Sequence, residues 1–335
     1  MYTFQLINYK DIDAAEYNEF EDKLIFQTKE WISFIVETQK VTPIIIKIFG
    51  DDNYIGYYTG FFFKKFGIKI VGSPFRGWST LYMGLNLKNN ENRVDIVIPL
   101  WNFLKKHYHI WYMELIDRFI TAEDAENAKL DFSFQKSYEK DISGEEMDVF
   151  KSLSSTCKNE IHRFERNEAI IREVEPTQEF AEKYYNQLKI VFGYQNLIPS
   201  YDLKRVQKLF EYIKEIGGAL YCTEVLSPNG ISIGTQIGFA YNNYCYLWGL
   251  TVIRDEQYYQ SNTLLWDAIK HWKALGYNTY DMVGEREYKL KFHPYEIVIP
   301  RITIYRFKIL NRLRDSAQKL YWKANKLKAK ITLKK

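Results

Sequence analysis

The sequence predicts an α/β protein built from two consecutive copies of one unit, because three features recur about half a chain apart. The stretch IGYYTGF at residues 55–61 returns as IGTQIGF at residues 233–239. Each copy lies in a predicted β-hairpin, and each hairpin is followed by a predicted amphipathic helix and a short apolar strand. Self-similarity at a fixed offset is typical of duplication. A length of 335 residues also exceeds what one core usually serves.

The expected elements follow the same order in both halves. Helical periodicity occurs first in FQTKEWISFIVET and in PTQEFAEKYYNQLKIVF. The two hairpins then read TPIIIKIF-GDDN-YIGYYTGFFF and ALYCTEVL-SPNG-ISIGTQIGFAY. Glycines inside the return strands indicate a bulge or the close approach of another backbone. The next segments are PLWNFLKKHYHIWYMELID and LLWDAIKHWKALGYNTYDMVG, each a helix leading to a strand that ends in an acid, Glu114 or Asp281.

Composition excludes several classes of protein. The chain is 46% hydrophobic and 26% charged, which is typical of a globular protein rather than a disordered one. Three scattered cysteines without CxxC spacing, and the absence of an HExxH motif, argue against a zinc site and a disulfide framework. The opening residues MYTFQLINYKDID lack a basic segment followed by an apolar run, and other apolar runs are too short for a bilayer. We therefore expect a cytoplasmic protein without a metal.

The order of elements, with glycine in the central hairpin, resembles the GNAT acyltransferase fold, and two fused copies resemble its Fem-type branch. The resemblance covers about residues 20–305 and is carried by KSLSSTCKNEIHRFERNEAIIREVE, NTLLWDAIKHWKALGYNTYDMVGE and EYKLKFHPYEIVIPR. In the last segment His293 and Pro294 stand where the family has glycines, and proline cannot adopt the positive φ open to glycine. The resemblance implies two GNAT-like units flanking a cleft: residues 1–140 on the acceptor side and 141–304 on the acyl-donor side.

Two residues are candidates for catalysis. The resemblance places Lys289 at the family's functional lysine, where a cation would stabilise negative charge developing on the reacting carbonyl. The alternative is a surface lysine on an alternating strand, with Lys291 on the same face. Asp281 ends a strand, where acids commonly line sites, and it is a candidate base or a partner of Lys289. Glu285 is a weaker candidate, and for both acids a structural role in a turn is the alternative.

The start of the second unit's last helix is the candidate site for the donor's phosphates. Ser261, Asn262 and Thr263 are good N-cap residues, and with Gln260 they precede a helical run. Free N–H groups and the helix dipole suit a diphosphate there. GNAT enzymes bind the coenzyme A pyrophosphate at this position through glycines, which the loop QYYQSNT lacks. An ordinary capped helix is the alternative.

Two further groups are candidates for substrate binding. Lys158, His162, Arg163 and Arg166 lie on one short predicted helix, where they would grip a phosphate or, with the interleaved glutamates, form a solvated face. The loop SPFRGWST carries Arg76 and Trp78, a pair suited to sugar or phosphate in the acceptor. The alternative is a turn in which Trp78 covers the core.

The last 31 residues, 305–335, carry 11 Lys/Arg against one Asp and follow a helical pattern with one apolar stripe. This predicts a basic amphipathic helix whose partner is an anionic membrane surface, a nucleic acid or the protein's own body. The sequence as a whole favours an N-acyltransferase that moves an acyl group from acyl-CoA, with acetyl-CoA the first candidate, to an amine of a sugar nucleotide or lipid-linked envelope precursor. An aminoacyl-tRNA-dependent transferase and an inactive binding protein are the alternatives.

Overall fold

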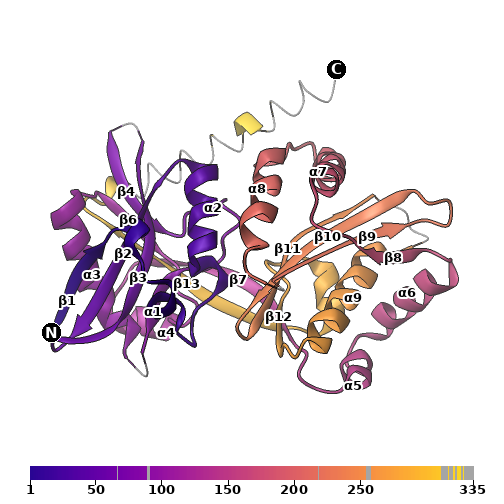
Figure 1. The fold of residues 1–335 in the computed structure, drawn as a ribbon, viewed down its shortest axis with the longest axis horizontal. Helices are drawn as coiled ribbons and strands as arrows, with labels where there is room; N and C mark the ends of the chain where they lie inside the picture. Colours follow the sequence, from indigo (N-terminus) through magenta and orange to yellow (C-terminus); the bar gives the residue numbers. More distant parts are fainter. Residues whose placement is uncertain are drawn as a thin grey trace. The chain divides into compact units, whose positions relative to one another are not determined.

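The chain forms two compact units, drawn in Figure 1. The computed structural model describes residues 1–65, 67–88, 91–217, 219–253 and 258–310, and in the tail 316, 320, 323–325 and 327. The first unit comprises Met1–Gln135 and Val298–Gln318, and the second comprises Lys136–Ile297 and Lys319–Lys335. The sequence-based boundaries placed 298–304 in the second unit, whereas these residues belong to the first. The predicted tail helix at 305–335 lies mostly outside the described residues.

The first unit is a mixed sheet with strand order β1-β2-β3-β4-β6-β13, in which β5 pairs with β3. Its pairs are antiparallel except for β4 and β6, which run parallel. The strands are β1 (Tyr2–Ile7), β2 (Thr42–Gly50), β3 (Asn53–Lys65), β4 (Ile68–Ser73), β5 (Gly84–Leu87), β6 (Tyr112–Leu115) and β13 (Tyr295–Tyr305). The helices are η1 (Tyr9–Asp11), α1 (Ala14–Asn18), η2 (Ile25–Gln27), α2 (Lys29–Gln39), α3 (Arg93–Tyr108) and α4 (Ala122–Asn127).

The predicted hairpin of the first unit is the β2–β3 pair. Gly50 pairs with Asn53, so the turn has two residues, and both Asp51 and Asp52 have positive φ (46° and 64°). Two positive values are what a tight turn between right-twisted strands requires. The repeat glycine Gly56 marks a close backbone approach, since a Cβ there would lie 2.0 Å from the carbonyl oxygen of Asn86 in β5.

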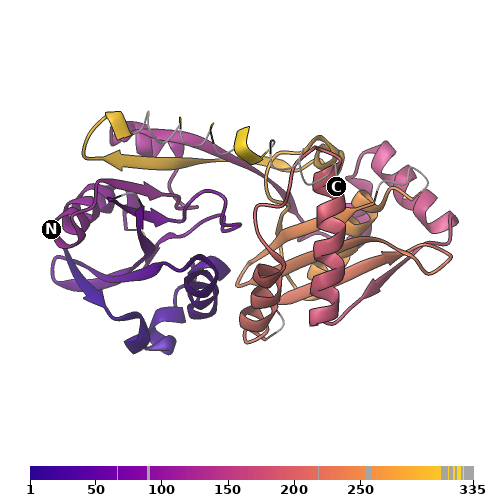
Figure 2. The ribbon, with the colours of Figure 1, turned by 90° about the horizontal axis from the view of Figure 1, so that it is seen from above.

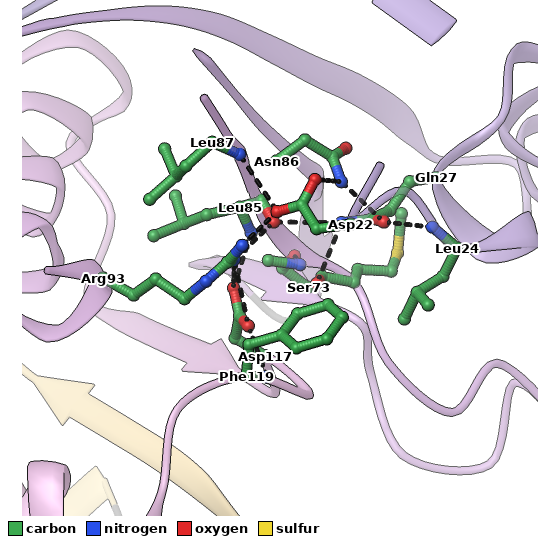
Figure 3. Close-up of polar contacts among 12 residues, drawn as sticks. Asp22, Leu24, Gln27, Ser73, Leu85, Asn86, Leu87, Arg93, Asp117 and Phe119 are labelled. Carbon is green, nitrogen blue, oxygen red and sulfur yellow. Dashed lines mark hydrogen bonds and ion pairs between the residues drawn. The ribbon is translucent and has the colours of Figure 1, made fainter. Parts of the chain in front are cut away.

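A network of buried polar groups fixes β5 and the start of α3 (Figure 3). The Arg93 guanidinium pairs with the carboxylates of Asp22 and Asp117, and it donates to the Leu85 carbonyl at 2.8 Å. Asp117 also accepts from the Leu85 N–H at 2.8 Å, and Asp22 accepts from the Leu87 N–H at 3.1 Å. Burial raises the pKa of the Asp117 carboxyl, and Arg93 opposes that shift. One cation therefore holds two carboxylates and one edge strand together.

The second unit repeats the plan with strand order β7-β12-β11-β10-β9-β8. The β11–β12 pair is parallel and the pairs of β7 with β12, β10 with β11, β9 with β10 and β8 with β9 are antiparallel. The strands are β7 (Phe132–Asp141), β8 (Ile170–Glu173), β9 (Leu220–Leu226), β10 (Ser232–Tyr241), β11 (Tyr244–Val252) and β12 (Thr279–Asp281). The helices are α5 (Glu146–Lys151), α6 (Ser155–Arg166), α7 (Gln178–Gly193), α8 (Leu203–Ile213), α9 (Gln260–Ala274) and η3 (Glu287–Phe292).

Local sequence explains where the helices of the second unit begin and what they cover. Side-chain caps start three of them: Ser154 for α6, Thr177 for α7 and Asp202 for α8. The apolar face of α9 packs with α5, α6 and η3 on one side of the sheet, around Trp266 and Trp272. Helix α7 lies on the other side, where it crosses the strands in Figure 2. The predicted order of helix, hairpin, strand, helix and strand thus occurs twice, which confirms the tandem α/β fold.

We expect the Arg93 network to be a large contributor to the stability of the first unit. Arg93→Leu leaves two largely buried carboxylates without their cation, a change that costs about 3–5 kcal/mol of unfolding free energy. Urea unfolding measures the loss. Arg306→Leu is the control, because that side chain is exposed and its change should stay within about 0.5 kcal/mol. Equal losses in the two variants would contradict the prediction.

Candidate functional site

The candidate site lies in the second unit, where the parallel pairing of β11 and β12 stops. Strand β12 pairs with β11 over three residues only, ending at Tyr246 opposite Asp281. Strand β11 continues to Val252, still paired with β10 on its other side. Among the described residues, its edge beyond Tyr246 has no strand partner on the β12 side. Backbone N–H and C=O groups along that edge are therefore available to a ligand.

A bulge opens β11 at the point of divergence. The register with β10 shifts between Ile237 and Gly238, which face Gly249 and Leu247, so Trp248 is the extra residue. A bulge bends its strand and re-aims the neighbouring groups. Of the two glycines in the second repeat motif, Gly238 lies at this bulge, where a Cβ would meet the Tyr246 carbonyl at 3.1 Å. Gly234 lies four residues earlier, and a Cβ there would meet the Thr251 carbonyl at 3.2 Å. This confirms the expectation that these glycines mark a bulge or a close approach.

The structure brings the two predicted catalytic residues into one turn at the end of β12. Asp281 is fully buried, and its Oδ1 lies 2.5 Å from Ser137 Oγ and accepts from the Val283 N–H at 2.8 Å. Lys289 lies in η3, not on a strand surface, and is 3% exposed. Its Nζ donates to the carbonyls of Met282 (2.7 Å), Val283 and Gly284 (3.4 Å). Both side chains therefore bind backbone groups of the turn Met282–Gly284: Asp281 binds one N–H group and Lys289 three carbonyls.

Burial lowers the pKa of Lys289 to about 8, and the nearby Asp281 carboxylate opposes that shift. The ammonium nevertheless has an acceptor for each of its three N–H groups in the turn carbonyls. Glu285, the weaker candidate, is exposed. His293 follows η3 with φ of 47°, so histidine adopts the left-handed conformation at the position where the family has glycine.

The start of α9 differs from the prediction in detail. The N-cap is Tyr259, in a left-handed conformation and without a side-chain cap, so Ser261, Asn262 and Thr263 lie inside the first turn. The prediction that these residues cap the helix is wrong, because their polar groups have other partners or lie within the turn. Gln260 donates to the Ile253 carbonyl at 3.1 Å, Thr263 to the Tyr259 carbonyl at 3.4 Å, and Asn262 to Glu160. The N–H groups of Asn262 and Thr263 also have an acceptor, the Tyr259 carbonyl, at 3.2 and 3.5 Å.

One of the predicted basic residues on α6 reaches this helix start. The Arg163 guanidinium lies 5.2 Å from the centre of the Tyr259 ring, and its Nη1 donates to the Tyr259 hydroxyl at 3.2 Å. Lys158 instead donates to the Lys151 carbonyl, and His162 contacts Glu165. Arg166 is exposed at the end of α6. The four residues share a helix as predicted, but only Arg163 contacts the start of α9.

Arg76 and Trp78 lie in the first unit. Arg76 is exposed and donates to Ser133 Oγ at 3.2 Å. The Trp78 ring packs against Phe61 and Phe75, so the tryptophan is half-buried and partly covers the core, as the structural alternative expected. In the described part of the chain, no group of three or more His, Cys, Asp or Glu side chains is arranged to hold a metal ion.

Sequence reasoning missed Ser137, Tyr259 and Glu160. Ser137 lies 144 residues before Asp281 along the chain and meets it only through the pairing of β7 with β12. Glu160 binds both Asn262 and Lys291, whose Nζ lies 2.7 Å from the carboxylate. No local sequence pattern predicts such contacts. Tyr259 is the exception, because it directly precedes the predicted helix and could have been recognised from that position.

Residues 151–290 match the acetyltransferase (GNAT) domain family. The matched residues lie in the second unit, and the fold of the two units is similar to that of FemX and of a tandem GNAT protein, so the chain is an acyltransferase with a tandem GNAT-like fold. The predicted family, fold class and enzyme class are thereby confirmed. No curated protein sequence matches the chain.

The chain aligns with nearly the whole length of several solved structures. FemX shares 9% identity at a TM-score of 0.68, with 90% of this chain and 97% of FemX covered. A conserved protein of unknown function from Bacteroides thetaiotaomicron shares 14% identity at 0.56, covering 91% and 100%. A tandem GNAT protein from the clavulanic acid biosynthesis pathway shares 8% identity at 0.54, covering 91% and 98%. These similarities concern the fold.

The titration of Lys289 gives a testable pH dependence of stability. Its pKa is lower in the folded protein (about 8) than in the unfolded chain (about 10.5), so between these values the unfolded state binds more protons. The unfolding free energy should therefore rise with pH across about 8 to 10.5 by on the order of 3 kcal/mol relative to Lys289→Met. Urea unfolding of both proteins at pH 7.5, 9 and 10 measures the difference. A difference that stays constant would contradict a buried, titrating lysine.

Proposed function

We propose that the protein is an N-acyltransferase that moves an acyl group from acyl-CoA, with acetyl-CoA the first candidate, to an amine on a sugar nucleotide or lipid-linked envelope precursor. The observation that supports this is the edge of β11 between Leu247 and Val252, which pairs with no described strand on the β12 side. The pantetheine arm of coenzyme A carries two amides, and an extended ligand with amides can pair with a strand edge as another strand would.

The groups at either end of β11 suit the two ends of such a donor. After β11 the chain leads to α9, whose first N–H groups and dipole favour a diphosphate, with Arg163 beside them. At the other end, the bulge at Trp248 lies close to the point where β12 ends at Asp281. The thioester would lie there, and a backbone N–H of the open edge would donate to the oxyanion.

In the proposed reaction the amine nitrogen attacks the thioester carbonyl carbon. The C–N bond forms, the C–S bond breaks, and coenzyme A leaves as a thiolate. Asp281 is the proposed acceptor of the proton that the amine loses, and Lys289 lies in the same turn. Arg76 and Trp78 are proposed to contact the acceptor in the first unit, because an exposed guanidinium and a half-buried tryptophan two residues apart in one loop suit a phosphorylated sugar.

One observation favours aminoacyl-tRNA as the donor instead. The Glu160 carboxylate binds the side chain of Asn262 in the first turn of α9. Lys291 pairs with this carboxylate at 2.7 Å and offsets part of its charge, but an acid this close still weakens the attraction of the helix start for a diphosphate. A donor without a diphosphate at this place would not meet that repulsion. The third hypothesis, an inactive binding protein, predicts that the protein consumes no acyl donor.

Calorimetry with coenzyme A and acetyl-CoA tests the donor. We expect binding in the micromolar range that weakens about tenfold in Arg163→Ala, because one charge-assisted contact near the diphosphate is lost. Lys270→Ala, in the third turn of the same helix, is the control and should bind as the wild type does. The absence of binding by a folded protein would rule out acyl-CoA, and filter binding of charged tRNA would then test the second donor.

We also propose that the basic tail contacts an anionic membrane surface from the cytoplasmic side. The tail residues Ile309, Leu320 and Leu327 are exposed apolar side chains among many lysines. None of the helices described in the structure is long and apolar enough to cross a membrane.

Vesicle flotation tests the tail. The protein should float with vesicles containing phosphatidylserine and remain in solution with purely phosphatidylcholine vesicles, because the lysines need anionic lipid. A chain ending at Tyr305 is the matched comparison and should not float. Equal flotation of the two chains would contradict the assignment to the tail.

A further inference from the structure

The turn that follows β12 contains a strained residue. Val283 has φ of 60°, in the left-handed region that β-branched residues avoid, and Gly284 follows with φ of 70°. A valine in this conformation is strained and persists only where its surroundings hold it. The question is which groups hold this turn, since it directly follows Asp281.

Lys289 supplies the main restraint. Its Nζ donates to the carbonyls of three consecutive residues, Met282, Val283 and Gly284. An ammonium has three N–H groups, so the turn occupies all of its donors. The side chain is 3% exposed and its position is therefore fixed from one side by packing and from the other by the turn.

The N–H groups of the same turn are also occupied. The Val283 N–H donates to Asp281 Oδ1 at 2.8 Å, and the Gly284 N–H donates to Ser137 Oγ at 3.1 Å. Ser137 Oγ also lies 2.5 Å from Asp281 Oδ1, so Asp281, Ser137 and the turn form one closed set of hydrogen bonds. A change in the turn must therefore move the Asp281 carboxylate.

We propose that Lys289 is a positioning residue that holds the strained turn Met282–Gly284, and with it the Asp281 carboxylate, rather than a group that contacts the reacting carbonyl. The part of this proposal that concerns catalysis rests on the function proposed above. The part that concerns the turn does not. Ser137 is the second positioning residue, because it joins the turn to Asp281 from β7.

The proposal predicts an unusual rescue. If Lys289 serves to hold valine in a left-handed conformation, glycine at position 283 removes most of the need for it, because glycine adopts that conformation without strain. A lysine whose charge acts on the transition state would be indispensable whatever residue stands at position 283. The two roles therefore differ in the double variant.

Hydrogen exchange of the Gly284 amide tests the turn without any substrate. We expect exchange at least tenfold faster in Lys289→Met than in the wild type, and a return to within about threefold in Lys289→Met/Val283→Gly. Lys291→Met is the matched control: it is the same change two residues along η3, at a lysine whose Nζ binds Glu160 and not the turn. It should leave the Gly284 amide unchanged.

The amide of Ile237 in β10 is the internal reference for unfolding of the whole unit. If both amides accelerate together in Lys289→Met, Ser137→Ala replaces it as the test, since it removes only the two hydrogen bonds of the Ser137 hydroxyl, with the Gly284 N–H and with Asp281, and should accelerate Gly284 alone. Unchanged Gly284 exchange in Lys289→Met, acceleration of both amides in Ser137→Ala, or a double variant as fast as Lys289→Met would overturn the proposal.

Acetyl transfer from acetyl-CoA to a panel of amino sugars is measured on the same proteins. We expect kcat to fall at least tenfold in Lys289→Met, with the KM for acetyl-CoA little changed, and to recover in the double variant with the wild-type pH profile. A double variant that remains inactive while its turn is restored would overturn the positioning role. If no variant, including the wild type, transfers acetyl groups, the proposed donor fails, and the exchange data still decide whether Lys289 holds the turn.

Discussion

The early end of the β11–β12 pairing is the constraint on which the candidate site depends. Two parallel strands that stay paired satisfy each other's backbone groups and leave nothing for a ligand. Here the pairing ends after three residues, at Tyr246 and Asp281, so β11 keeps an open edge and β12 leads into a turn. The bulge at Trp248, the strained Val283 and the buried Lys289 all lie at or next to this divergence.

Features that depend on short stretches of sequence were predictable. The duplicated order of elements, the turn at Asp51–Asp52 and the strand ending at Asp281 follow from periodicity and turn residues, and the structure has them all. The location of Asp281 and Lys289 beside the same turn also followed, because only eight positions separate them in the chain. Contacts that sheet topology creates were not predictable: Ser137 reaches Asp281 only because β7 pairs with β12, and no local pattern encodes that pairing. The left-handed Val283 was unpredictable for another reason, since its residue type argues against that conformation.

The acid near the end of the second strand of the parallel pair has different partners in the two units. Glu114 is the last residue but one of β6, beside the parallel strand β4, and Asp281 ends β12 beside β11. Glu114 forms a buried ion pair with Arg301 of β13 and accepts from the Tyr112 hydroxyl at 2.9 Å. Asp281 instead shares its turn with a lysine whose pKa burial brings down to about 8. A carboxylate fixed to a buried guanidinium is poorly suited to accept a proton. The difference supports placing the chemistry in the second unit and leaving the first to bind.

The late position of Arg301 in the chain also affects the order in which the two sheets can form during synthesis. The first unit is discontinuous in the chain, and β13, which pairs with β6 and carries the cation for Glu114, is translated after nearly all of the second unit. Domains commonly fold from the N-terminus during synthesis, but this one lacks strand β13 and the cation of Arg301 until residues 295–305 have left the ribosome. All strands of the second unit's sheet, from β7 to β12, precede β13 in the chain. We therefore expect the sheet of the second unit to be complete before that of the first, whose strand β6 has an unpaired edge until β13 is made.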